Sequence, residues 1–215
     1  MIVAVVPVKS PIRAKTRLGA DLSQGEREGV TRAMLGDVLA ALKASDRITA
    51  TYVVAEDEAL IPDGTSVILE PVNRGYDEAI AAALSDSRVS QADAILILPS
   101  DVPLVRPEDI DELCEAFDGT CVRIAPDRGN GGTNGLLIQP PHLMATSFGS
   151  GSFERHLAAA REIADRVEIL TLPGLALDID TPQDLMEFLG SDAKTQTRTY
   201  LKQSGIARRL LNTPG

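Results

Sequence analysis

Tryptophan is absent from this chain, and aromatic residues of any kind make up only 3% of its 215 residues. A surface that stacks on nucleic-acid bases needs several aromatic side chains, so their scarcity argues against such a surface. The net charge of −10 argues against binding along a phosphate backbone as well. We therefore expect no nucleic-acid partner.

The sequence contains no run of about 18 apolar residues, which is the length that would cross a bilayer. Met1 leads directly into a short apolar run, without the charged segment and cleavage site of a secretory signal. These features predict no membrane partner and a cytoplasmic location. A homodimer is compatible with the sequence.

Cysteine and histidine are scarce, with two of each. Cys114 and Cys121 lack the companions of a metal site, and we expect buried free thiols in a reducing compartment, a disulfide between them being the less favoured alternative. His142 and His156 are far apart in sequence, and we interpret both as structural or surface residues. No histidine-based or cysteine-based chemistry is predicted.

Hydrophobic residues are plentiful, at 44%, and apolar runs alternate with helical patterns. This alternation predicts a three-layer α/β/α fold with a mostly parallel, doubly wound sheet. One domain is expected over residues 1–190, and the tail 191–215 is expected to form a short packed helix with a frayed end. The expected strands are 2–6, 51–55, 66–69, 94–98, 121–125, 135–138 and 167–171, and the expected helices are 23–42, 74–84, 108–117, 153–164 and 182–189.

Residues 7–18 follow the first expected strand and concentrate positive charge in an acidic chain. In open α/β sheets, ligands collect at the carboxyl ends of strands, so this segment is a candidate cradle for a nucleotide triphosphate. A solvated basic loop is the alternative. The cations are Lys9, Arg13, Lys15 and Arg17.

Acidic side chains follow two other segments. Asp101 comes just after the apolar strand 94–98 and between two prolines, although Asp-x-Pro is also a common turn. Asp178 and Asp180 are two residues apart in an extended segment, so their carboxylates point to one side and repel unless a cation lies between them. Magnesium suits such a site, while helix capping by Asp180 is the alternative.

Two glycine-rich segments can approach an anion closely. The loop 125–135 offers backbone amides and the Thr133 hydroxyl, although a plain hairpin is the alternative. The segment 148–153 leads into an expected helix, where Ser152 and the free amides of the first turn are suited to phosphate. Ordinary capping by Ser152 is the alternative.

Five motifs occur here in a specific order: Pro-Val-Lys-x5-Lys-Thr-Arg-Leu, Leu-Pro-Ser-Asp-Val-Pro-Leu, Ala-Pro-Asp-Arg…Gly-Thr-Asn, Phe-Gly-x-Gly-Ser and Leu-Asp-Ile-Asp-Thr-Pro. In this order they resemble the guanylyltransferases of coenzyme F-420 biosynthesis, the CofC/FbiD family. The resemblance runs from Ile2 to about Leu189. It implies a nucleotidyltransferase fold, similar to nucleotide-diphospho-sugar transferases and to molybdenum-cofactor guanylyltransferases.

The resemblance also implies roles for individual residues. Asp101, Lys9 and Lys15 would be catalytic, and GTP and a phosphorylated three-carbon acid would be the substrates. The implied ligands of two magnesium ions are Asp101, Asp178 and Asp180. The implied acid-binding residues are Thr133, Gly149 and Ser152, and the implied nucleotide-binding residues are Lys9, Lys15, Arg17, Glu70, Asn73, Gly75 and Ser100.

The implied reaction transfers GMP from GTP to phosphoenolpyruvate, 3-phospho-D-glycerate or 2-phospho-L-lactate, with release of pyrophosphate. The sequence leaves the choice of acid open. Three other functions remain as alternatives. They are a nucleotidyltransferase for the molybdenum cofactor or a sugar phosphate, a metal-dependent glycosyltransferase, and a non-catalytic nucleotide-binding domain.

Overall fold

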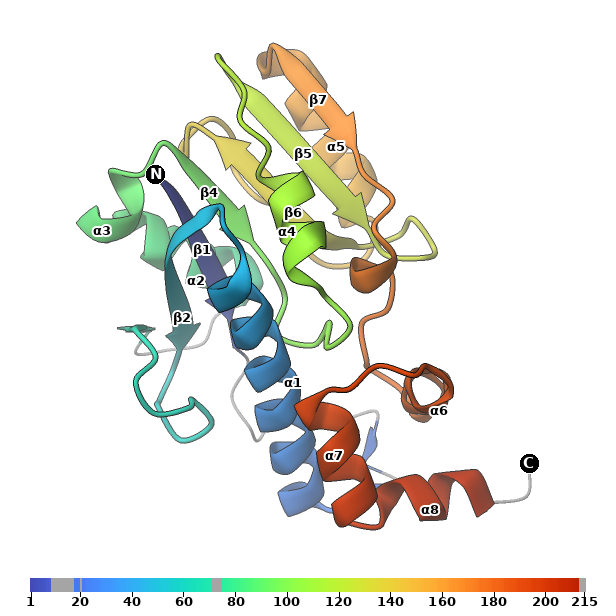
Figure 1. Cartoon of the computed structure of the whole chain (residues 1–215). Coiled ribbons are helices and arrows are strands. Elements are labelled where there is room, and N and C mark those ends of the chain that lie inside the picture. The colour runs from blue at the N-terminus through green and yellow to red at the C-terminus, as the bar shows by residue number, and fades with distance from the viewer. Residues whose placement is uncertain (9–17, 20, 71–74, 213–215) are drawn as a thin grey trace.

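The computed structural model describes residues 1–8, 18–19, 21–70 and 75–212, and its centre is a seven-stranded sheet with the order β3-β2-β1-β4-β6-β5-β7 (Figure 1). β6 is antiparallel to its neighbours β4 and β5, and the other strand pairs are parallel. The predicted mostly parallel α/β sheet is confirmed, with one reversed strand that the sequence pattern did not indicate. The strands are β1 (Ile2–Pro7), β2 (Ile48–Ala55), β3 (Val67–Leu69), β4 (Ala94–Ile97), β5 (Cys121–Pro126), β6 (Thr133–Gln139) and β7 (Arg166–Ile169).

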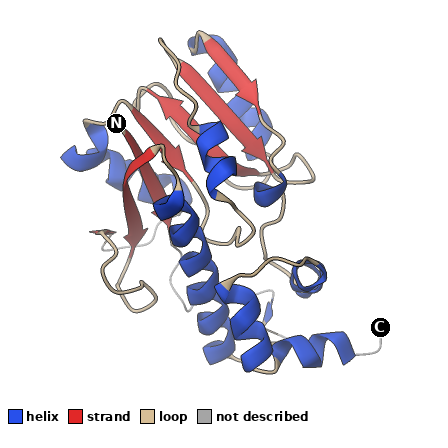
Figure 2. Cartoon of the chain, in the orientation of Figure 1, coloured by secondary structure: helices blue, strands red, loops and turns tan. Residues whose placement is uncertain are grey.

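Helices cover both faces of the sheet, which gives the expected three layers (Figure 2). One face packs against α1 (Gln24–Ala44) and α4 (Pro107–Leu113), and the other against α2 (Tyr76–Ser85) and α5 (Ser152–Ile163). The remaining helices are α3 (Ser87–Ser90), the 3-10 turn η2 (Pro173–Leu175), α6 (Pro182–Gly190), α7 (Gln196–Gln203) and α8 (Ile206–Asn212).

The central strand β4 shows how the two faces are divided. Ile95 and Ile97 belong to the core beneath α2 and α5, whereas Leu96 and Leu98 belong to the core beneath α1 and α4. All four are fully buried, because successive side chains of a strand alternate between two covered faces. Packing on both faces therefore holds β4 in place up to the edge of the sheet, where the strand leads into the segment that carries Asp101.

Helix α1 begins where the sequence predicted. The Ser23 hydroxyl and the Glu26 carboxylate form the expected capping box, with the Ser23 amide 2.9 Å from the Glu26 carboxylate. The helix expected over residues 108–117 ends earlier, at Leu113. The buried guanidinium of Arg123 on β5 donates to the carbonyl oxygens of Leu113, the last residue of the helix, and of Glu115 just beyond it.

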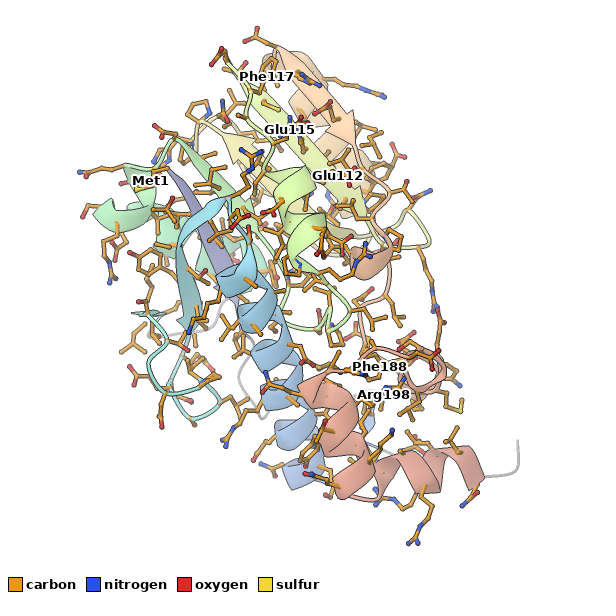
Figure 3. All side chains as sticks on the ribbon, in the orientation of Figure 1. Met1, Glu112, Glu115, Phe117, Phe188 and Arg198 are labelled. Carbon is orange, nitrogen blue, oxygen red and sulfur yellow. The ribbon has the colours of Figure 1, made fainter. Side chains whose placement is uncertain are left out.

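The C-terminal segment forms two helices, α7 and α8, and α7 packs along α1. Gln196 and Thr197 donate their backbone amides to the Asp37 carboxylate of α1, at 2.6 and 2.9 Å. Figure 3 shows Arg198 beside Phe188 of α6, and its guanidinium carbon is 5.8 Å from the centre of the Phe188 ring. The expected frayed end lies at 213–215, outside the described residues.

These helices enclose a third hydrophobic core with the N-terminal half of α1. Its fully buried members include Val30 and Met34 on α1, Phe188 on α6 and Leu201 on α7. The C-terminal half of α1 lies instead against the sheet. One helix therefore joins two separate cores.

The two cysteines are buried free thiols, as predicted, and burial raises the pKa of the Cys114 thiol to about 12. Within the described ranges, every helix is too short or too polar to cross a bilayer.

Candidate active site

A cavity of about 760 Å³ opens where β4 ends and where β6 begins. Because β6 runs opposite to β4, its first residues lie at the same edge of the sheet as the last residues of β4. The edge is the one at which α/β proteins collect ligands. Of the residues predicted to form the site, those that line this cavity are Gly75, Asp101, Thr133, Gly149, Ser152, Asp178 and Asp180.

The two acidic segments lie side by side. The backbone amide of Ile179 donates to the carbonyl oxygen of Asp101, at 3.0 Å, and this bond joins the segments directly. Ile179 is fully buried, whereas Asp178 and Asp180 on either side of it line the cavity. The expected common orientation of these two carboxylates is thus consistent with the structure.

Electrostatics connect these carboxylates. Burial raises the pKa of Asp178, and the nearby charges of Asp101 and Asp180 raise it further. The side-chain amide of Asn134 opposes this effect by donating to the Asp178 carboxylate at 3.2 Å. Burial and the Asp101 charge also raise the pKa of the Tyr76 hydroxyl well above 10. The site therefore has a concentrated negative potential.

Asp101, Asp178 and Asp180 form one side of the cavity, here called the acidic wall, and carboxylate oxygens are ligands that suit a hard cation. Among the described side chains, no three His, Cys, Asp or Glu groups already stand together as a metal-holding cluster. Asp101, Asp178 and Asp180 nevertheless supply three carboxylates to one cavity, and their mutual repulsion is the condition that a divalent cation relieves.

Asp180 does not cap helix α6 with its side chain. Thr181 is the N-cap, and its hydroxyl forms a capping box with Asp184. The Asp184 carboxylate also accepts the Asp180 backbone amide, at 3.1 Å. Thr181 therefore has the capping role that was the alternative for Asp180, and Asp180 lines the cavity.

A β-bulge at the start of β6 exchanges the faces of the sheet that Thr133 and Asn134 would occupy in a regular strand. Ala125 pairs with Gly135 but Pro126 pairs with Thr133, so Asn134 is the extra residue. Regular alternation from Leu136 would direct Asn134 toward α5. Instead its amide donates to the Leu175 carbonyl at 2.9 Å, on the face that α4 covers. Bulges commonly redirect side chains beside active sites.

Thr133 is directed to the α5 face. Its hydroxyl oxygen is 3.0 Å from His156 Nδ1 and 3.2 Å from the Ser152 hydroxyl, and all three residues are buried. Ser152 therefore does not cap α5 with its side chain, since the N-cap is Gly151. The predicted pair Thr133 and Ser152 is in direct contact.

The loop 147–151 passes over the N-terminus of α5 and completes this wall. Gly149 and Gly151 have φ angles of +102° and +73°, which only glycine adopts without strain. Arg155 on α5 holds the loop, because its guanidinium donates to the carbonyls of Ser147 and Ser150 at 3.0 and 2.7 Å.

The glycine-rich loop 126–132 does not offer its amides to a ligand, contrary to the expectation. Asp127 accepts the backbone amides of Gly129, Gly131 and Gly132, at 2.8 to 2.9 Å. The carboxylate thus closes the loop on itself. Only the Thr133 hydroxyl at its end remains from the predicted set of donors.

Of the remaining predicted residues, the structure describes Glu70 and Ser100, and neither lines the cavity. Glu70 is buried and donates its amide to the Ala55 carbonyl at 2.9 Å, which extends β3. Ser100 lies between two cavity residues, Pro99 and Asp101, but within the described part of the chain it is not a lining residue. The other predicted nucleotide-binding residues lie outside the described residues: Lys9, Lys15, Arg17 and Asn73.

Residues that sequence reasoning missed include Asn134 and Phe148, which line the cavity, and His156, which is buried behind the lining residue Thr133. Asn134 belongs to the recognised Gly-Thr-Asn motif, and the adjoining Thr133 was a signal for it. His156 lies four residues after Ser152, on the same side of α5, which was the available signal for that residue. Phe148 packs between Tyr76 and His156, with ring centres 4.7 and 4.8 Å away.

The fold is that of the nucleotidyltransferase class. The chain superposes on a solved nucleotidyl transferase of Methanothermobacter with a TM-score of 0.63, at 15% identity, over 94% of this chain and 99% of that one. The family model described as "Guanylyl transferase CofC like" matches residues 2–214. The chain belongs to this family of CofC-like guanylyl transferases.

Individual relatives agree with the family. The chain is 36% identical to a phosphoenolpyruvate guanylyltransferase of Sphaerobacter thermophilus, over 87% of this chain and 92% of the relative. It is also 36% identical to a 2-phospho-L-lactate guanylyltransferase of Methanothermobacter thermautotrophicus, over 93% of this chain and 89% of the relative. The guanylyltransferase family that the sequence motifs predicted is thus confirmed.

Proposed function

We propose that this protein transfers GMP from GTP to a phosphorylated three-carbon acid and releases pyrophosphate, as a step in coenzyme F-420 biosynthesis. The observation that carries the proposal is one cavity with two unlike walls. Carboxylates form one wall, and the other consists of hydroxyls and a helix N-terminus. The names of the phosphoenolpyruvate and 2-phospho-L-lactate guanylyltransferase relatives support this class of acceptor.

The acceptor phosphate is assigned to the wall formed by Thr133, Gly149 and Ser152. The Ser152 amide donates to the Gly149 carbonyl at 3.0 Å, but the next amides of α5, those of Phe153 and Glu154, have no acceptor within the helix, and the helix dipole favours an anion there. The two hydroxyls add short-range donors. The left-handed Gly149 lets the backbone come close to a ligand without a side chain in the way.

Asp101, Asp178 and Asp180 are assigned to magnesium. When bound, the ions would neutralise charge where two polyanions must meet. Asn134 would hold Asp178 in place through its amide, and the Ile179 amide would hold the Asp101 segment. In this proposal Asp101 is the central carboxylate, because its segment lies between β4 and Asp178.

GTP is assigned to the side of the cavity beside Gly75. Lys9, Lys15 and Arg17 would neutralise charge that develops on the leaving pyrophosphate, although these three cations lie outside the described residues. Glu70, Asn73, Gly75 and Ser100 are the proposed contacts to the nucleoside. Of these, Gly75 lines the cavity.

The proposed reaction requires no general base. An oxygen of the acceptor phosphate attacks the α-phosphorus of GTP, the bond from the α-phosphorus to the bridging oxygen breaks, and pyrophosphate leaves with that electron pair. A phosphate monoester has its second pKa near 6, so the attacking oxygen is already anionic at pH 7. The site accordingly consists of groups that orient and neutralise charge.

The test is an acceptor panel. Purified protein is incubated with GTP and Mg²⁺ and with phosphoenolpyruvate, 3-phospho-D-glycerate, 2-phospho-L-lactate, a sugar phosphate or no acceptor. Pyrophosphate release is measured, and the product is identified by mass. Release with a three-carbon phospho-acid, and a product heavier by GMP, is the expected result. Two outcomes would contradict the proposal. One is pyrophosphate release with the sugar phosphate but with none of the three-carbon phospho-acids, and the other is the absence of release with every acceptor tested.

A further inference from the structure

His156 is a buried histidine in direct contact with the proposed acceptor wall. It is 1% exposed and lies on α5, one turn after Ser152. Its Nδ1 atom is 3.0 Å from the Thr133 hydroxyl oxygen, and its Nε2 atom is 2.9 Å from the backbone nitrogen of Ser147. Each ring nitrogen therefore has one partner.

The partner of Nε2 determines the state of the ring. The Ser147 backbone amide can only donate, so Nε2 must be the unprotonated nitrogen. The single proton of a neutral imidazole then lies on Nδ1, where it is donated to the Thr133 oxygen. Burial lowers the pKa of His156 to about 4. The negative charge of Asp77 raises this pKa and the positive charge of Arg155 lowers it, and the ring is neutral at pH 7.

The Thr133 hydroxyl consequently receives two hydrogen bonds, from His156 and from Ser152. A hydroxyl oxygen has two lone pairs and one hydrogen, so both lone pairs are used. Among the described residues no acceptor takes the remaining Thr133 hydrogen. Thr133 lines the cavity, so a ligand bound there would supply the acceptor for this hydrogen.

We infer that His156 is a positioning residue, which fixes the Thr133 hydroxyl as a hydrogen-bond donor toward the phosphate of the acceptor. The inference rests on the proposed function and specifies how its acceptor wall works. Phe148 supports the ring, since it packs edge-on against His156 at 4.8 Å. The Phe148 amide donates to Asp77 of α2 at 3.0 Å, which ties this support to a second helix.

Two matched variants separate the two hydrogen bonds of the ring. In His156→Asn the amide nitrogen stands near the position of Nδ1, so a donor to Thr133 is kept and the acceptor for Ser147 is lost. In His156→Gln the amide oxygen reaches the position of Nε2, so the acceptor for Ser147 is kept and the donor to Thr133 is lost. A purely structural histidine would make both variants equally impaired.

The kinetic test measures KM for the acceptor and for GTP separately. We expect His156→Gln to raise KM for the acceptor about tenfold, which corresponds to one oriented hydrogen bond, with KM for GTP within about twofold of wild type. We expect the KM of His156→Asn for the acceptor to stay close to the wild-type value. Equal increases in the two variants, or an increase in KM for GTP alone, would overturn the inference.

A second measurement does not depend on activity. The chain has only two histidines, and His142 is exposed, so His142→Asn assigns the ¹⁵N signals of both rings. The ligand-free protein at pH 7 should show a neutral His156 ring protonated on Nδ1. Protonation on Nε2 would overturn the inference. If wild-type protein has this tautomer and yet uses no three-carbon phospho-acid, the proposed function fails and the positioning of Thr133 stands.

Discussion

Asp101 is the residue on which the proposed chemistry depends most. Asp101→Asn keeps the size of the side chain but removes a charge from the acidic wall, and we expect turnover to fall by orders of magnitude while the fold remains intact. Pyrophosphate release and far-ultraviolet circular dichroism measure the two effects. Asp63→Asn, on an exposed loop, is the matched control and should keep normal turnover. Near-normal turnover in Asp101→Asn would contradict the assignment of Asp101 to magnesium.

His156 should make stability depend on pH. Burial lowers its pKa from 6.5 to about 4 in the folded protein, so between these values only the unfolded chain binds a proton. Stability should therefore fall as the pH drops from 6.5 toward 4, by about 2 kcal/mol at pH 5. Urea unfolding of wild type and His156→Asn at pH 7 and pH 5 measures this effect, since other groups contribute equally to both. A difference between the proteins that does not change with pH would refute it.

The sequence predicted some cavity residues from their place after a strand or before a helix, although Glu70, which also follows a strand, does not line the cavity. Asp101 comes after a recognisable apolar strand, and Ser152 begins a recognisable helix, so their position at the sheet edge followed from the pattern. The amides of Gly129 and Gly131 were misjudged, because the pattern cannot tell whether a nearby carboxylate such as Asp127 already occupies them.

Among the secondary-structure elements, η2 couples the acidic wall to the rest of the fold. A Cβ atom at Gly174 would lie 2.7 Å from the Leu104 carbonyl oxygen, too close for any real contact. Gly174→Ala should therefore cost about 1 to 3 kcal/mol and displace the segment that leads to Asp178. Urea unfolding and turnover are the measurements.

The control for this prediction is Gly190→Ala at the end of α6, where a Cβ atom would have nothing within 4 Å. This variant should retain wild-type stability within about 0.5 kcal/mol. Equal stability of the two variants would show that η2 can shift without cost.

The elements were predicted better at their starts than at their ends. The Ser23–Glu26 capping box located the start of α1, because its partners are three residues apart. The end of α4 depends on Arg123, which is ten residues beyond Leu113 and on another element. The reversed direction of β6 was likewise set by pairing with β4 and β5, which no local pattern contains.

In the whole molecule, the third core attaches the C-terminal helices to the sheet domain through α1. Leu201→Ala would leave a cavity in this core, since Leu201 is fully buried, and should cost about 2 to 5 kcal/mol. Leu211→Ala on α8, where the leucine is 66% exposed, is the matched control and should cost little. Thermal unfolding monitored by circular dichroism compares them. Equal melting temperatures would show that α7 contributes no stability.

The bulge at Asn134 places two adjacent residues in the two proposed walls of the active site. Thr133 belongs to the acceptor wall and Asn134 to the acidic wall, so the two walls are joined by one peptide bond. Adjacent Cα atoms across a trans peptide are 3.8 Å apart, and motions of the surrounding helices do not change this distance. A nucleophile held at one wall and an electrophile held at the other would therefore be kept in register by covalent geometry. Deleting or adding a single residue at 133–134 would change that register.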